Sequence, residues 1–206
     1  KPADQVVEYL ESNMRQLGNE LTGKTLTHLS EVAETFIDLL EARSANGGGI
    51  MGLKTGIEGI DEKLAGFDPD ALIVLAGRPS MGKTLLSQTI MANVGVHQGL
   101  GSIIFSMEMS EKQLFERFVS GLSGVCSHKL RTGTLDDSDW ARVGEGIKLI
   151  NDCKIHIDTQ AKLSVGQIRA RTRRHIAKHG KQALIVIDYL GLMAKPKADR
   201  NDLSIG

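Results

Sequence analysis

The chain has 206 residues, of which 41% are hydrophobic and 24% charged, and its formal net charge is zero. This length suits one full domain with appended segments, and the composition is that of an ordinary globular protein. No apolar run is long enough to cross a bilayer, residues 1–20 do not predict a secretory leader, and the two cysteines lack a metal-ligand spacing. We therefore expect a cytoplasmic protein with free thiols and no membrane partner, which excludes a disulfide scaffold.

Charge is distributed unevenly along the chain. Residues 1–50 hold four basic and eight acidic side chains, whereas residues 162–200 hold ten basic and two acidic ones. A basic segment of this kind can bind phosphate groups. For residues 169–178 alone, a solvated helix face is the better interpretation.

Two amphipathic helices are predicted near the N-terminus, at residues 4–17 and 28–43. In the second helix, apolar residues recur at helical spacing along one face. Residues 44–49 are rich in glycine and indicate a flexible linker. The apolar stripe of residues 28–43 needs a surface to cover it, and both the rest of this chain and another subunit stay open as that surface.

Beyond residue 52, apolar strands alternate with helices. This pattern predicts an α/β fold with a mostly parallel sheet, right-handed crossovers and helices on its faces. The expected strands are residues 71–76, 102–107, 154–158 and 183–190, and the expected helices are residues 84–97, 110–122, 137–150 and 165–179. The last helix has a predicted capping box formed by Ser164 and Gln167, and Gly180 is expected to end it.

The most informative motif follows the first expected strand. Residues 77–84 carry Gly, four residues, Gly-Lys-Thr, which is the phosphate-binding loop pattern. Backbone amides in such a loop converge on a polyphosphate at the positive end of the next helix, the lysine reaches the β and γ phosphates, and the Thr hydroxyl holds Mg²⁺. A strand before the loop and a helix after it make a chance glycine-rich turn the weaker interpretation. The expected nucleotide-binding residues of the loop are Gly77, Arg78, Pro79, Ser80, Met81, Gly82, Lys83 and Thr84.

Two carboxylates complete the expected site. Four apolar residues lead to Asp188, which places this carboxylate at the C-terminal end of a buried strand, where open α/β sheets bind ligands. We expect Asp188 to bind the nucleotide and to share Mg²⁺ with Thr84. The next residue is Tyr189, which cannot act as a base at neutral pH, so the base must come from elsewhere. Glu108, at the end of the second strand, is the candidate that holds the attacking water, although it also fits as a simple helix start.

Histidine offers one further candidate. His175 and His179 have the spacing of one helix face, which is compatible with a zinc site. A solvated helix end is the better interpretation of this pair.

Together these residues resemble the RecA-like ATPase core of the bacterial DnaB-type replicative DNA helicases. The matching stretches run in family order and comprise residues 53–61, 78–84, 105–110, 130–140, 167–170 and 185–190. The inner loop residues, from Arg78 to Met81, and the stretch 130–140 are more specific than the phosphate loop itself. Some details also resemble phage-encoded members, so the expected location is the cytoplasm of a bacterial or phage-infected cell.

The resemblance implies a function and a set of partners. It implies ATP and Mg²⁺ as cofactors, 5′-to-3′ translocation on single-stranded DNA and unwinding of forked duplex DNA. It also implies a ring hexamer, with the linker helix at residues 28–43 on the neighbouring subunit and an arginine finger donated across the interface. A helicase loader and a primase are the expected further partners.

The resemblance also implies how the chain is organised. Residues 1–24 would end an N-terminal helical domain, residues 25–52 would form the linker helix and glycine-rich linker, and residues 53–206 would form a RecA-like P-loop core that is incomplete at its C-terminus. Candidate DNA contacts follow the last strand, at Lys195, Lys197 and Arg200.

Two departures and two alternatives accompany this interpretation. Gly191 stands where family members commonly carry glutamine, and the arginine finger would lie beyond residue 206. A RecA-like recombinase or repair ATPase shares the loop and a similarly placed glutamate. A non-enzymatic, helicase-derived module that binds a partner through its acidic helices is the second alternative.

Overall fold

The computed structural model describes residues 28–45, 50–69, 71–78, 80–188, 191 and 193. Contacts divide the chain into two units, Lys1–Gly49 and Ile50–Gly206, and each unit is described by itself. The helix expected at residues 4–17 lies outside the described residues.

In the first unit, the helix expected at residues 28–43 is confirmed. It begins as a short 3₁₀ turn, η1 (Leu29–Val32), and continues as the α-helix α2 (Ala33–Ala45). The ring of His28 caps the start by accepting a hydrogen bond from the Ser30 amide. We call five apolar residues along these turns the α2 stripe, namely Leu29, Val32, Phe36, Ile37 and Leu40; all five are exposed, as is Leu39 beside them.

The second unit is built on a parallel sheet of three strands, β1 (Ser102–Ser106), β2 (Ile155–Asp158) and β3 (Leu184–Asp188), in the order β2-β1-β3. β1 is the central strand, and all five of its residues are buried. Successive strands are joined through helices, as a parallel sheet requires. The predicted α/β class and three of the four expected strands are confirmed.

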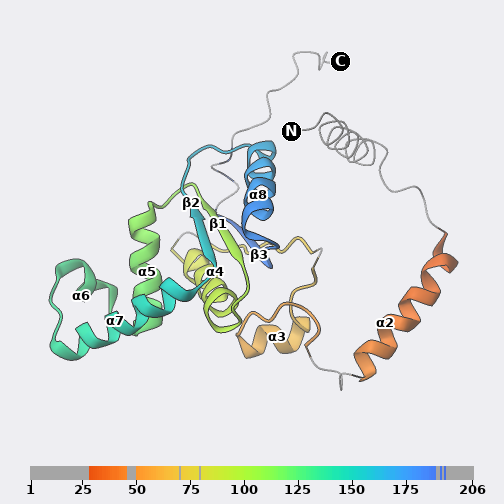
Figure 1. Ribbon diagram of the computed structural model, residues 1–206, viewed down its shortest axis with the longest axis horizontal. Helices are drawn as coiled ribbons and strands as arrows, with labels where there is room; N and C mark the ends of the chain where they lie inside the picture. The colour runs from red at the N-terminus through yellow and green to blue at the C-terminus, as the bar shows by residue number, and fades with distance from the viewer. Residues whose placement is uncertain are drawn as a thin grey trace, which may run out of the picture. The chain divides into compact units, whose positions relative to one another are not determined.

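Helices precede the first strand and occupy the connections between the strands (Figure 1). Their bounds are α3 (Glu58–Leu64), α4 (Lys83–Ala92), α5 (Glu111–Ser123), α6 (Ser127–Thr132), α7 (Asp137–Asp152) and α8 (Val165–His179), and the π-helical turn η2 (Asn93–His97) extends α4. The four helices expected in this unit are confirmed, with η2 completing the first of them. The short helices α3 and α6 were not predicted.

The two faces of the sheet pack against different helices, and Figure 1 shows α5 and α8 on opposite sides of the strands. On one face, Ile103 and Phe105 of β1 pack with Ile168 of α8. On the other face, Ile104 of β1 packs with Met91 of α4 and with Leu114 and Phe118 of α5. The alternation follows from the period of two along a strand. A third apolar cluster joins α5 to α7 through Val119 and Val143.

Three helices begin with a reciprocal capping box. In the predicted one, the Ser164 side chain accepts from the Gln167 amide and the Gln167 side chain accepts from the Ser164 amide. Gly180, with φ of 83°, follows the helix and confirms its expected end. Equivalent boxes start α5 at Ser110 and α7 at Asp136.

The strand expected at residues 71–76 is not formed, which corrects the prediction. This segment has no strand assignment, and Leu72 and Val74 are 91% and 68% exposed. A strand exists only when a neighbour completes its hydrogen-bond ladder. Among the described residues, the sheet ends at β2 and β3, and neither of them pairs with residues 71–76. Apolar composition was therefore insufficient to specify a strand here.

Candidate functional site

The carboxyl ends of β1 and β3 lie side by side. Ser106 is the register partner of Asp188, and the amide of Met107 donates to the Asp188 carbonyl oxygen at 2.8 Å. Residues that follow β1 and end β3 therefore share one edge of the sheet, the edge at which open α/β sheets bind ligands.

The phosphate loop ends in the backbone shape that its sequence predicts. Gly82 has φ of 81° and stands as the N-cap of α4, which starts at Lys83. Ser80 also has a positive φ of 64°, a conformation that costs a non-glycine residue roughly 1–2 kcal/mol. The amide of Met81 donates to the carbonyl of Arg78 at 3.3 Å. Gly77, Arg78, Ser80, Met81 and Gly82 are exposed, whereas Pro79 lies outside the described residues.

Thr84 and Asp188 are brought into direct contact although 104 residues separate them in sequence. The Thr84 hydroxyl donates to Oδ2 of Asp188 at 2.9 Å. Asp188 is only 8% exposed. Hydroxyl and carboxylate oxygens are the ligands that Mg²⁺ prefers. The donor set of these two residues therefore fits the expected metal.

Lys83 lies across the phosphate loop. Its Nζ donates to the carbonyl oxygens of Gly77 and Arg78 at 3.0 and 3.2 Å. These bonds hold a positive charge inside the loop. A polyphosphate placed there would exchange neutral carbonyl partners for charged oxygens, which form stronger hydrogen bonds to ammonium.

Glu108 follows β1 by two residues at the same edge as Asp188, and it is exposed. Its neighbour Met109 is tied back to the strand, because the Met109 amide donates to the Ser106 hydroxyl at 3.2 Å. Among the described residues, no hydrogen bond or ion pair engages the Glu108 carboxylate, so both of its oxygens are available. The helix α5 starts three residues later with Ser110 as its cap, so Glu108 is not the residue that starts the helix.

Sequence reasoning missed a structural support that ties the segment before the loop to the C-terminal end of α4. The buried carboxylate of Asp61 accepts from the amide and hydroxyl of Thr55, both at 2.8 Å, and from the amide of Gly56 at 3.0 Å. The carbonyl of Thr55 in turn accepts from Nδ2 of Asn93, just after α4. The signal available in the sequence was the Thr-Gly pair six residues before an aspartate, inside the stretch 53–61.

The basic residues divide into two groups. On α8, Arg169, Arg173 and Arg174 are exposed, as a solvated helix face predicts, whereas Arg171 pairs with Asp158 at 2.5 Å. The candidate DNA contacts Lys195, Lys197 and Arg200 lie outside the described residues, as does Tyr189.

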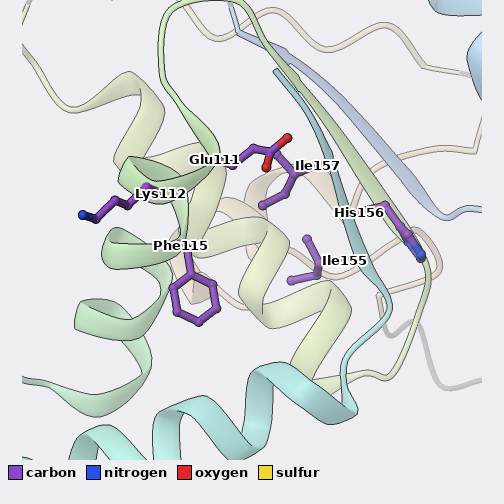
Figure 2. A pocket seen from close by; sticks show the side chains of 6 residues that line it. All are labelled: Glu111, Lys112, Phe115, Ile155, His156 and Ile157. Atoms are coloured by element: carbon purple, nitrogen blue, oxygen red, sulfur yellow. The ribbon is translucent and has the colours of Figure 1, made fainter. Parts of the chain in front are cut away.

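A hollow of about 530 Å³ opens between α5 and β2 (Figure 2). It is lined by three apolar residues and three polar ones: Phe115, Ile155, Ile157, Glu111, Lys112 and His156. Neither the phosphate loop nor Glu108 or Asp188 lines this hollow. It is therefore separate from the candidate nucleotide site.

Comparison with known proteins agrees with this geometry. The family model described as DnaB-like helicase C terminal domain matches residues 52–205. The chain is 37% identical to replicative DNA helicase DnaB of Pasteurella multocida (strain Pm70) over 86% of this chain, and 39% identical to its counterpart in Buchnera aphidicola subsp. Baizongia pistaciae (strain Bp) over 72%. The chain spans 39% and 32% of the length of these two relatives.

Solved structures are similar as well. A solved ATPase domain matches with a TM-score of 0.74 and 26% identity, covering 82% of this chain and 60% of that one. A DnaB-like replicative helicase, solved in a study of its interactions with primase, matches with a TM-score of 0.76 and 24% identity over 96% of this chain and 49% of its own. The second likeness shows the shared fold. Among the described residues, no helix has the length and apolar character to span a membrane.

Proposed function

The chain belongs to the DnaB-like helicase C-terminal domain family, and on that premise we propose that it is part of a subunit of a replicative DNA helicase that couples ATP hydrolysis to DNA unwinding. The observation that carries this proposal is the 2.9 Å hydrogen bond between Thr84 and Asp188. It joins the phosphate loop to the strand-end carboxylate at the ligand-binding edge of the sheet, as phosphoryl transfer with Mg²⁺ requires.

The phosphate loop binds the polyphosphate of ATP. Its amides and the N-terminus of α4 supply partial positive charge, and Lys83 exchanges the carbonyls of Gly77 and Arg78 for phosphate oxygens. Thr84 and Asp188 hold Mg²⁺, which, when bound, neutralises charge on the β and γ phosphates. The remaining nucleotide-binding residues are Pro79, Ser80, Met81 and Gly82 of the loop.

Glu108 orients the attacking water and accepts its proton. The water oxygen bonds to the γ phosphorus as the bond from that phosphorus to the bridging oxygen breaks, which releases ADP and phosphate. The exposed carboxylate of Glu108 lies at the same sheet edge as Asp188 and has no partner among the described residues, which supports this role. A positioned general base contributes roughly 10²–10⁴ in rate.

The subunit works in a ring hexamer, with the α2 stripe docked on a neighbouring subunit. The stripe supports this because Phe36 and Ile37 are 51% and 54% exposed on a helix, and apolar surface gathered on one face marks an interaction site. Replacing Ile37 by Asp should shift the assembled protein to smaller species in light scattering. D38N, on the same helix, serves as the control; unchanged assembly of I37D contradicts the role of the stripe.

The whole protein acts on single-stranded and forked DNA and moves 5′ to 3′ in the cytoplasm of a bacterial or phage-infected cell. The similarity to DnaB helicases supports these assignments, and the solved relative studied with primase supports a primase partner, with a loader beside it. Lys195, Lys197 and Arg200 contact DNA, and an arginine from the neighbouring subunit completes the ATP site. In this arrangement residues 1–24 end an N-terminal helical domain, residues 25–52 form the linker helix and glycine-rich linker, and residues 53–206 form the RecA-like core.

The test is unwinding of a forked duplex by the full-length protein that contains this chain. We expect ATP-dependent strand separation, and E108Q should keep nucleotide binding while single-turnover hydrolysis falls about 10²–10⁴-fold. The matched control is E145Q, because Glu145 is exposed on α7. A change within about twofold for E108Q overturns the base assignment. Filaments and strand exchange without unwinding indicate the recombinase instead, and absence of any ATP turnover indicates a non-enzymatic module.

A further inference from the structure

Three histidine rings gather between β2 and α8, away from the phosphate loop. His156 belongs to β2, and His175 and His179 belong to the last turns of α8. The ring centroids lie 4.1 Å apart for His156 and His175, 4.5 Å for His175 and His179, and 5.0 Å for His156 and His179. We call these three residues the histidine cluster. The sequence favoured a solvated helix end for the last two, which is wrong for His175 because its side chain is half-buried.

The fold explains why the rings meet. His156 is the register partner of Ile103, so its side chain points to the face of the sheet that α8 covers. Figure 2 shows His156 directed away from Ile155 and Ile157, which face α5. On α8, Ile168, Thr172, His175 and His179 follow one another at helical spacing on one side, from the buried Ile168 to the exposed His179.

Two ring nitrogens of the histidine cluster have no partner. Nδ1 of His156 and Nε2 of His175 are buried and make no hydrogen bond within the described residues. Buried polar atoms almost always have a partner, so an orphaned pair in one cluster needs an explanation. Burial, with the neighbouring imidazoles adding to it, lowers the pKa of both rings, while a hydrogen bond with the Lys154 backbone raises that of His156.

We propose that the histidine cluster is a binding site for a divalent transition metal, with Zn²⁺ as the best fit. Each ring offers one nitrogen, and these three nitrogens all lie within 4.8 Å of one another. Tetrahedral Zn–N bonds of roughly 2.0–2.1 Å place ligating nitrogens about 3.3–3.4 Å apart, so small side-chain rotations close the site. Two histidines four residues apart on a helix are a recurrent half of such sites.

The site would fasten the end of α8 to an edge strand of the described sheet. β2 pairs only with β1 among the described strands, and His175 and His179 stand in the last turns of α8. The cluster holds no carboxylate, and Lys178 is the charged group that acts on His175. A site of three neutral imidazoles leaves a fourth position for water or an exchangeable ligand. Soft and borderline ions are favoured over Mg²⁺, which prefers oxygen.

The test is metal titration of the intact, untagged chain with Co²⁺ as a spectroscopic probe and Zn²⁺ as competitor. Millimolar Mg²⁺ is kept present to occupy the phosphate-loop site. We expect one equivalent of Co²⁺ to give the visible absorption of a four-coordinate site, Zn²⁺ to abolish it, and Zn²⁺ to raise the melting temperature. H179N should weaken Zn²⁺ binding by at least about tenfold, since losing even an outer partner of a ligand costs roughly 10–100-fold.

Matched variants make the result decisive. His179 is exposed, so H179N leaves the packing of α8 intact, which circular dichroism verifies. H128N removes an exposed imidazole on α6 and should leave the titration unchanged. H179D restores a possible ligand atom and should recover part of the affinity. Absence of a Co²⁺ spectrum, or equal binding by H179N and the unaltered chain, overturns the proposal and leaves the cluster as packed imidazole rings.

Discussion

Asp188 at the phosphate-loop edge and Asp61 in the segment before it are both buried, with exposed fractions of 8% and 5%, but their surroundings differ. Asp61 accepts three hydrogen bonds, from Thr55 and Gly56. The Asp188 carboxylate accepts one among the described residues, from Thr84. A carboxylate has about four lone-pair positions, so Asp61 is nearly saturated and Asp188 is not. Spare acceptor capacity, rather than burial, separates a carboxylate available for a metal from one that stabilises the fold.

Asp139 at the α6–α7 corner follows the pattern of Asp61. It accepts from Lys129 at 2.5 Å, from Arg142 at 2.6 Å and from the amide of Asp136 at 3.3 Å. The bond from Lys129 is the largest cause that lowers the pKa of Asp139 below its ordinary value. Asp139 is fully buried and its carboxylate accepts several hydrogen bonds, so we infer that it stabilises the fold and does not bind a metal.

The largest expected effect comes from D188N. Asparagine still accepts the hydrogen bond from Thr84 but loses the charge that holds Mg²⁺, so hydrolysis should fall by about 10²-fold or more while stability barely changes. ATP turnover and urea unfolding of the same preparation measure the two quantities. If stability falls strongly and turnover persists, Asp188 is a structural carboxylate like Asp61, and the proposed contrast between the two residues is wrong.

D61A should lower stability and leave nucleotide binding intact, the reverse of the result expected for D188N. The amides of Thr55 and Gly56 lose their acceptor, and buried donors left without a partner cost about 1–3 kcal/mol in unfolding free energy. Urea denaturation measures the loss of stability. At urea concentrations well below the unfolding midpoint, the variant should still bind nucleotide. D61N keeps one acceptor oxygen and is the graded control; equal losses for both variants would argue against hydrogen bonding as the cause.

A smaller loss of stability is expected from S164A at the start of α8. Removing the cap leaves the Gln167 amide without its acceptor, which costs about 1 kcal/mol. Thermal melting measures this, with S110A at the equivalent cap of α5 as a matched comparison. A local cap is independent of the nucleotide site, so hydrolysis should not change in either variant.

The smallest expected change in stability comes from protonation of Asp136 at acid pH. A hydrogen bond from Ser138 is the first cause that lowers the pKa of Asp136 from 3.8 to about 2. Because the folded pKa is depressed, its stabilisation is present above pH 4 and disappears as the pH falls toward 2. The contribution is small because Asp136 is exposed and solvent screens it. Unfolding midpoints of S138A and the unaltered chain should therefore differ at pH 6 and converge near pH 2.

Much of the fold was readable from local pattern. Strands β1, β2 and β3 and the helices α4, α5, α7 and α8 were predicted because their periodicity, and for α8 also its cap, lies within contiguous residues. α3 and α6 were missed because they have only seven and six residues, too few for a helical period to stand out. The proximity of Thr84 and Asp188 was expected because the loop motif assigns Thr84, and the strand-end position assigns Asp188, to the same metal.

The sequence by itself determined the phosphate loop, the capping boxes and the alternation of strands and helices, since each depends on neighbours within a few residues. Tertiary structure alone decided which carboxylates are saturated, that residues 71–76 lack a strand partner among the described residues, and that His156 meets His175 and His179. These outcomes depend on which distant segments come together, and strand register sets that. A shift of one residue in β2 would turn His156 to the other face of the sheet.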